Sequence, residues 1–138
     1  MIYEQLRYFN VDENWGEPSK VNPFLLLILD ELRHYIGHSF IIHNAFATSG
    51  HSENSQHYLG NAVDYHIKGI SFKSAVDKTL KHLSKMKFLN NQIIDYCGIG
   101  IYPEWNNPGF HLDVRGYQAS WGRIKNKYVS FDYAYKFI

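Results

Sequence analysis

Two short strand-like segments each carry a histidine and a carboxylate, and this feature constrains the fold more than any other. Residues 62–67 alternate, so that Asp64 and His66 face one side of a strand while apolar residues face the other. His111 and Asp113 are related in the same way within 110–114. Because an unpaired buried carboxylate is costly, the two segments indicate a site on one face of a sheet.

His57, Asp64 and His111 are candidate ligands of a metal ion in this site. Zinc in hydrolytic sites commonly has three nitrogen or oxygen ligands and a water in the fourth position. If the two strands are neighbours, one face presents Asp64 and His111, and His57 folds over from a loop in which Gly60 lets the chain turn. Asp113 would lie roughly 6.6 Å further along the strand, where it can orient a ligand or polarise a metal-bound water.

The rest of the sequence predicts an α+β fold with an antiparallel sheet and flanking helices, because strands follow one another with few helices between them. Asn22 and Pro23 are typical of a helix start, and Gly37 of a helix end. Ser71 is a second candidate cap. The expected elements are helices at 23–36 and 72–86, strands at 40–47, 62–67, 92–101 and 110–114, and a closing strand or hairpin within 121–138.

Length and composition narrow the classes of function. The 138 residues predict a single domain, 1–138, and a net charge of +1 disfavours a nucleic-acid partner. The longest apolar run, Phe24–Leu29, is too short to span a bilayer, so we expect no membrane insertion. The one cysteine, Cys97, cannot build a thiolate zinc site alone. Residues 1–10 lack the features of a signal peptide, which predicts synthesis in the cytoplasm.

The pattern S-x-H-x-x-G-x-A-x-D, followed by G-F-H-x-D in a later strand, resembles the zinc D-Ala-D-Ala carboxypeptidase family. The first motif is matched at each defined position, and the second supplies the third ligand; the matching residues are Ser55, His57, Gly60, Ala62, Asp64 and His111. The run 98–103 also resembles the family's approach to that ligand. The resemblance covers residues 44–123.

The family belongs to the hedgehog/DD-peptidase fold group and cleaves cell-wall peptides. The resemblance therefore implies a zinc peptidase domain in which His57, Asp64 and His111 hold Zn²⁺. It implies hydrolysis of peptide bonds in peptidoglycan cross-links or stem peptides, with the stem peptide as partner. Because the family includes small phage endolysins, it also implies a phage or prophage enzyme that reaches the wall through a holin or on the virion. We expect a monomer.

One departure from the family concerns the substrate. The family's carboxypeptidases usually carry an Arg in an S-G-Y-R segment, where it binds the terminal carboxylate, whereas 48–54 contains no Arg. An endopeptidase is therefore favoured, with His51 or Arg115 as candidate substitutes for the missing Arg.

A second departure concerns the general base. In the family it is often an Asp or Glu three residues before the last His, and this chain has Pro108 there. Glu104, on a loop that could swing over the metal, and Asp113, on a strand, are the two candidates for the role.

Five residues near the motifs are expected to contact substrate. His51 or His66 would steady the oxyanion or orient a ligand, and Trp105 would form a groove wall against sugar or peptide. The complete set is Ser55, His51, His66, Trp105 and Arg115.

Two other functions remain open at this point. The chain would be a cell-wall-binding module or phage structural component if it kept zinc but had lost catalysis. It would be a metal-free protein if the motif were fortuitous, which stoichiometric zinc would exclude.

Overall fold

The first long helix shows how the sequence fixes an element by its ends. In a computed structural model that describes residues 1–138, α1 spans Pro23–Ile36. The side chain of Asn22 accepts a hydrogen bond from the backbone of Phe24, and Gly37 ends the helix in the left-handed region, at φ 77°. The prediction of a helix at 23–36 is confirmed.

The second helix, α2, spans Phe72–Lys85 and begins where Ser71 accepts a hydrogen bond from the backbone of Ser74. It ends one residue earlier than predicted, before Met86. Its apolar face contributes Val76 and Leu83 to the core.

Six strands form one sheet in the order β1-β2-β6-β5-β7-β8. The strands are β1 Phe40–Asn44, β2 Ala62–Ile67, β5 Gly98–Tyr102, β6 Gly109–Asp113, β7 Ala119–Ile124 and β8 Lys127–Val129. All neighbours pair antiparallel except β5 and β7, which pair in parallel. The chain reverses after β5 and again after β6, so β7 runs in the direction of β5. The α+β class and the largely antiparallel sheet are confirmed, and the parallel pair differs from the prediction.

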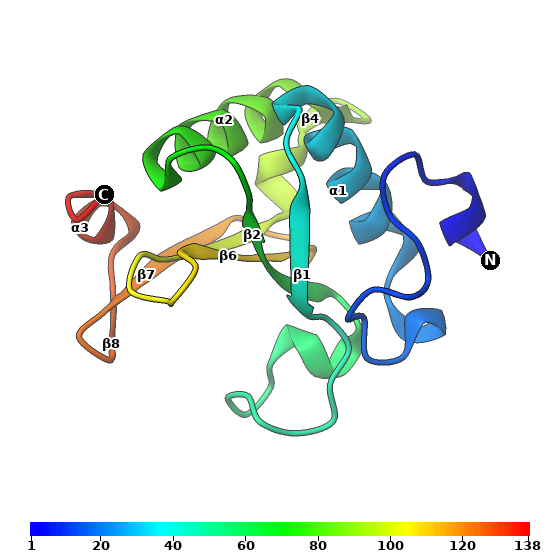
Figure 1. Cartoon of the computed structure of the whole chain (residues 1–138), viewed down its shortest axis with the longest axis horizontal. Coiled ribbons are helices and arrows are strands. Elements are labelled where there is room, and N and C mark those ends of the chain that lie inside the picture. Colours follow the sequence, from blue (N-terminus) through cyan, green and yellow to red (C-terminus); the bar gives the residue numbers. More distant parts are fainter.

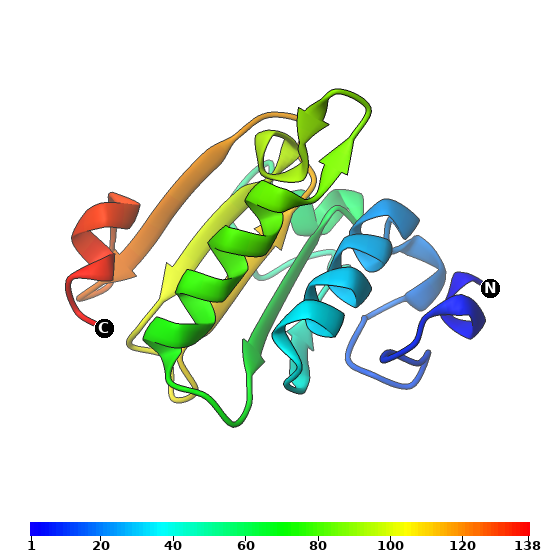
Figure 2. The same ribbon diagram turned by 90° about the horizontal axis from the view of Figure 1, so that it is seen from above.

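The helices α1 and α2 cover one face of this sheet, as Figures 1 and 2 show. The strands turn their apolar residues toward these helices, including Tyr65 of β2 and Phe110 of β6, whose rings stack 5.2 Å apart. The segment between β1 and β2 lies on the opposite side of the sheet (Figure 1). The sheet therefore keeps one face free for a site.

Three predicted segments differ in detail. Within 92–101, residues Ile93–Tyr96 form a 3-10 helix because Ile93 is buried against α2, and they follow the small hairpin of β3 (Lys87–Phe88) and β4 (Asn91–Gln92). The strand predicted at 40–47 ends earlier, at an irregularity in the ladder between Ile42 and Asn44.

The third difference lies at the C-terminal end of the chain. Here the predicted hairpin exists as β7 and β8, but a short helix, α3 (Phe131–Tyr135), follows it. Ser130 caps this helix by accepting a hydrogen bond from the backbone of Tyr133, and α3 packs against β7. None of the helices has the length and apolar character that crossing a membrane requires.

Candidate functional site

Neighbouring strands bring Asp64 and His111 together. They are directly opposite in the antiparallel pair of β2 and β6. Oδ1 of Asp64 lies 3.2 Å from Nδ1 of His111 and 3.2 Å from Nε2 of His57. The structure thus places two of the expected ligands, His57 and His111, around one oxygen of the third, Asp64.

A tight turn holds His57 in place. The residue lies in the 3-10 helix Gln56–Leu59, which ends at Gly60 with φ 74°. A Cβ at Gly60 would come within 1.9 Å of the Lys20 carbonyl oxygen, so both the conformation and the close approach require glycine. Nδ1 of the buried His57 ring lies 2.7 Å from the carbonyl oxygen of Ala45. Because a carbonyl only accepts, Nδ1 carries the proton and Nε2 is the atom that faces Asp64.

Asp113 holds His111 from behind. Oδ2 of this fully buried carboxylate lies 2.7 Å from Nε2 of His111. Arg115 binds the same carboxylate with Nε at 2.9 Å and Nη2 at 2.7 Å, and the backbone N–H of Gly98 donates to it at 3.1 Å. Burial alone would raise the pKa of Asp113, but the hydrogen bonds from Arg115 and His111 outweigh burial and hold it below its ordinary value. Asp113 is therefore an ionised partner of His111, in the manner of carboxylates that orient metal-bound histidines.

The hydrogen bonds to Ala45 and Asp113 fix one proton on each imidazole, and the groups that then face Asp64 repel it. With Nδ1 of His57 and Nε2 of His111 protonated, two imidazole lone pairs and a carboxylate oxygen face one another. Burial raises the pKa of Asp64, but a proton on the facing nitrogen of His111 or His57 bonds to the carboxylate and holds its pKa below the ordinary value, so the carboxylate is ionised. Burial lowers the pKa of His111, yet the bonds to Asp113 and Asp64 leave it raised. A shared proton or a nearby cation would relieve the repulsion between these groups.

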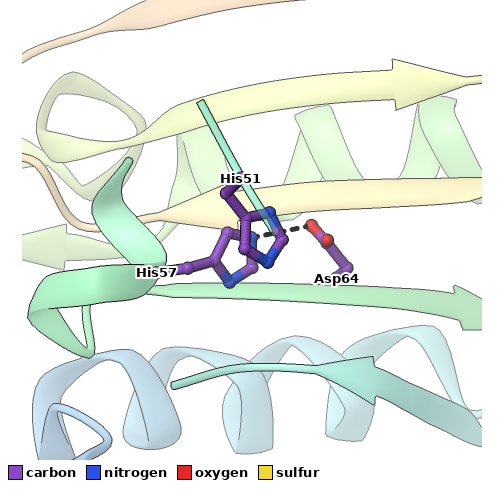
Figure 3. A group of neighbouring side chains, drawn as sticks. All are labelled: His51, His57 and Asp64. Atoms are coloured by element: carbon purple, nitrogen blue, oxygen red, sulfur yellow. Dashed lines mark hydrogen bonds and ion pairs between the residues drawn. The ribbon is translucent and has the colours of Figure 1, made fainter. Parts of the chain in front are cut away.

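His51 completes the cluster from the loop. Its ring stacks on that of His57, with centroids 4.1 Å apart and an interplanar angle of 15°. Figure 3 shows the two rings face to face with the Asp64 carboxylate beside them. Ligand atoms of His51, His57 and Asp64 lie within 4.8 Å of one another, so this group can hold a metal ion. The group differs from the predicted set, because His51 takes the place of His111 in it. Burial and the neighbouring His57 lower the pKa of His51, which favours the neutral ring.

A bulge in β1 determines what supports His51. The ladder pairs Ile42 with Tyr65 and then Asn44, not His43, with Asp64. This extra residue points Asn44 toward the site, where its amide nitrogen lies 2.7 Å from Nε2 of His51. Since an amide N–H donates, Nε2 accepts and Nδ1 of His51 carries the proton in this arrangement.

The cluster lies in the wall of an open cavity of about 900 Å³. Two glycines of β5 make room in it. A Cβ at Gly98 would lie 2.7 Å from both Asp113 oxygens, and one at Gly100 would lie 2.5 Å from Nε1 of Trp121. The Gly98–Gly100 spacing therefore lets the Asp113–Arg115 pair and the Trp121 ring lie over β5.

The other expected site residues have different surroundings. Ser55 accepts a hydrogen bond from the backbone of His57 and lines the cavity. Trp105 lines it too, with its ring stacked on Tyr102 at 4.3 Å. Arg115 lines the cavity while bound to Asp113.

Three expected residues, Asp113, His66 and Glu104, are not among those that line the cavity. His66 faces His43, with Nδ1 2.6 Å from Nε2 of that ring. Glu104 is exposed and accepts a hydrogen bond from the backbone N–H of Lys125 at 2.6 Å.

The sequence analysis missed several residues of the cavity wall. They are Glu53 in the loop, and the group Tyr117, Trp121, Arg123 and Tyr128 on the far side. Asn44, which contacts His51 from outside the wall, was also not predicted. The alternation of Trp121 and Arg123 was a usable signal, because residues two apart on a strand share a face. The pairing of β7 with β5, which puts that face beside His111, had no signal of its own.

Comparison of the chain with protein-family models, curated proteins and solved structures gives no match.

Proposed function

We propose that this chain is a zinc endopeptidase that hydrolyses peptide bonds in bacterial peptidoglycan. One observation supports it above the others: two imidazole nitrogens that their partners leave unprotonated converge on one oxygen of Asp64, in the wall of an open cavity. This donor set, with nitrogen and oxygen ligands only, is the kind that hydrolytic zinc sites use. The motif around His57 and Asp64 favours the same chemistry.

We assign the zinc to His57 Nε2, His111 Nδ1 and Asp64, with His51 as the alternative third nitrogen. When bound, zinc would polarise a scissile carbonyl and lower the pKa of a water molecule. Asp113 keeps His111 in the tautomer that this role needs. The stacked His51 ring, neutral near pH 7, would donate a hydrogen bond to the oxyanion.

Proton transfer requires an acceptor that faces the cavity. Asp113 is enclosed by His111 and Arg115, and Glu104 is directed to the backbone of Lys125. The carboxylates of the cavity wall are Asp64, which the histidines bind, and Glu53. We therefore assign the proton acceptor to Glu53.

The same proposal extends to fold group and setting. A largely antiparallel sheet with helices on one face is compatible with the hedgehog/DD-peptidase group. An enzyme of phage or prophage origin, made in the cytoplasm and released through a holin or carried on the virion, would meet this substrate at the cell wall.

Metal analysis combined with hydrolysis of purified peptidoglycan tests the proposal. We expect one zinc per chain and muropeptide fragments identifiable by mass spectrometry, both lost in His57→Ala. The matched control is His34→Ala, an exposed histidine of α1. A wild-type protein without zinc, or a His57→Ala variant that hydrolyses as well as wild type, would exclude this function.

A second function is favoured by one observation, namely that neither carboxylate first expected as the base lines the cavity. A module that binds peptidoglycan without cleaving it would keep zinc and sediment with cell walls but release no fragments. Fragment release by wild type, abolished in Glu53→Gln, would exclude this alternative.

A further inference from the structure

The far wall of the cavity carries one cation that no carboxylate neutralises. Arg115 is bound to Asp113 through two nitrogens. Arg123 lines the same cavity but forms no ion pair, and its one hydrogen bond is from Nη2 to the carbonyl oxygen of Asn126, at 3.1 Å. Because a guanidinium has five N–H donors, most of those on Arg123 remain available to a ligand.

The hairpin of β7 and β8 holds this guanidinium in place. Its carbon lies 4.3 Å from the centre of the Tyr128 ring, across the strand pair. The connecting residues Lys125 and Asn126 have φ of 51° and 64°, as in the tight two-residue turns that join antiparallel strands. A stacked, hydrogen-bonded guanidinium loses little freedom when it binds a planar anion.

The register of the sheet gives the position of Arg123 relative to the proposed zinc site. Gly100 of β5 pairs with His111 on one side and Trp121 on the other. Arg123 is two residues beyond Trp121 on the same face. Two strand spacings across and one residue pair along place its Cα on the order of 12 Å from that of His111. An extended peptide covers that distance in about three residues.

We propose that Arg123 binds a carboxylate of the peptide substrate about three residues from the scissile bond. The proposal rests on the proposed peptidase function and adds a substrate class: an acidic peptide that extends across β5 toward β7. A carboxylate at this distance suits an endopeptidase, whereas release of a single terminal residue would need the cation next to the zinc. Trp121 and Tyr102, which lie between the two points, would contact the intervening residues.

Synthetic D-alanine-containing peptides with one carboxylate, or the matching carboxamide, one to four residues from the cleaved bond test the proposal. For wild type we expect kcat/KM to be about 10-fold or more higher for the carboxylate at the third position, the size of a charge-assisted hydrogen bond. Arg123→Gln should remove this preference, mainly through KM, by bringing the rate for the carboxylate peptide down to that for the carboxamide. Arg123→Lys should retain part of it. Lys127→Gln, an exposed cation on β8, is the control and should keep the preference.

Binding of the same peptide pairs, measured by calorimetry on metal-free and zinc-loaded protein, separates the two proposals. Carboxylate-dependent binding that Arg123→Gln abolishes supports Arg123 even if wild type cleaves nothing, in which case only the peptidase function fails. The Arg123 proposal is overturned if neither peptide binds, if wild type has no carboxylate preference, or if Arg123→Gln leaves the preference unchanged or lowers both peptides equally. Equal melting temperatures of wild type and Arg123→Gln verify the fold of the variant.

Discussion

At the scale of single residues, the two carboxylates first considered as bases have different surroundings. Asp113 is buried with His111 and Arg115, while Glu104 is exposed. Asp113→Ala should lower zinc affinity about 10–100-fold, as loss of a ligand-orienting carboxylate does. It should also cost about 3–5 kcal/mol of folding free energy, because it leaves a partly buried Arg unpaired. Competition with a zinc-sensitive dye and urea denaturation measure the two effects, and Glu104→Ala should show neither.

His51 and His111 are the two candidates for the third zinc ligand. His51 offers a ring nitrogen near Asp64, but its hydrogen bond with Asn44 places the proton on Nδ1. His111 presents Nδ1 unprotonated when the ring is neutral. We therefore expect His111→Ala to abolish stoichiometric zinc binding and His51→Ala to weaken it less than tenfold, as measured by calorimetry. The reverse order would make His51 the ligand.

At the scale of elements, β5 matters because its glycine at position 98 has no side chain. An alanine at position 98 would put a Cβ 2.5 Å from Nε of Arg115 and 2.7 Å from the Asp113 oxygens. Gly98→Ala should therefore displace this pair and lower zinc affinity in the same range as loss of Asp113, while circular dichroism stays native. Ser120→Ala, an exposed change on the neighbouring strand, is the control. Unchanged affinity in Gly98→Ala would mean that Asp113 does not position His111.

Local signals predicted individual elements well. Asn22, Pro23 and Gly37 fixed both ends of α1 because caps are decided by residues next to one another. The alternation around Asp64 fixed β2 for the same reason. The failures lie elsewhere: Ile93–Tyr96 has the residues of a strand, yet packing against α2 makes it a helical turn.

At the scale of the whole molecule, the site depends on pairings between distant segments, and this limited what the sequence could predict. The meeting of His57, Asp64 and His111 could be predicted because each lies in a recognisable strand or turn. The cavity wall from β7 was not, because the parallel pairing of β5 and β7 leaves no pattern in either strand. The bulge that turns Asn44 toward the site likewise has no recognisable sequence signal.

Zinc binding should stabilise the entire fold. A ligand at 100 times its Kd adds about 2.7 kcal/mol, which for a domain of this size corresponds to a rise in Tm of roughly 5–10 °C. Differential scanning fluorimetry should show this rise with zinc and its reversal with EDTA. The His57→Ala protein should show no rise, and an equal rise in that variant would place the zinc elsewhere.

Acid should destabilise the metal-free protein. The pKa values of Asp64 and Asp113 both lie below the ordinary 3.8 when the chain is folded, so their contribution to stability is present above pH 3.8 and is lost progressively as the pH falls below it toward the folded pKa values. The pKa of His111 is raised above 6.5, so its contribution is present at lower pH and is lost on the alkaline side. Urea denaturation between pH 3 and 8 should therefore show a maximum between these limits. Asp113→Ala should flatten the acid side, and an unchanged slope would contradict the assignment.

The helices cover one face of the sheet, so alternate residues of β2 and β6 face the core beneath the helices, and the residues between them face the site. A point substitution can therefore change a residue of one face without changing the residues of the other. Insertion or deletion of one residue inside these strands would move each following side chain to the opposite face. Asp64 would then point into the core and Tyr65 into the cavity. Natural variation in this lineage should therefore consist of substitutions in these strands, with insertions and deletions confined to the connecting loops.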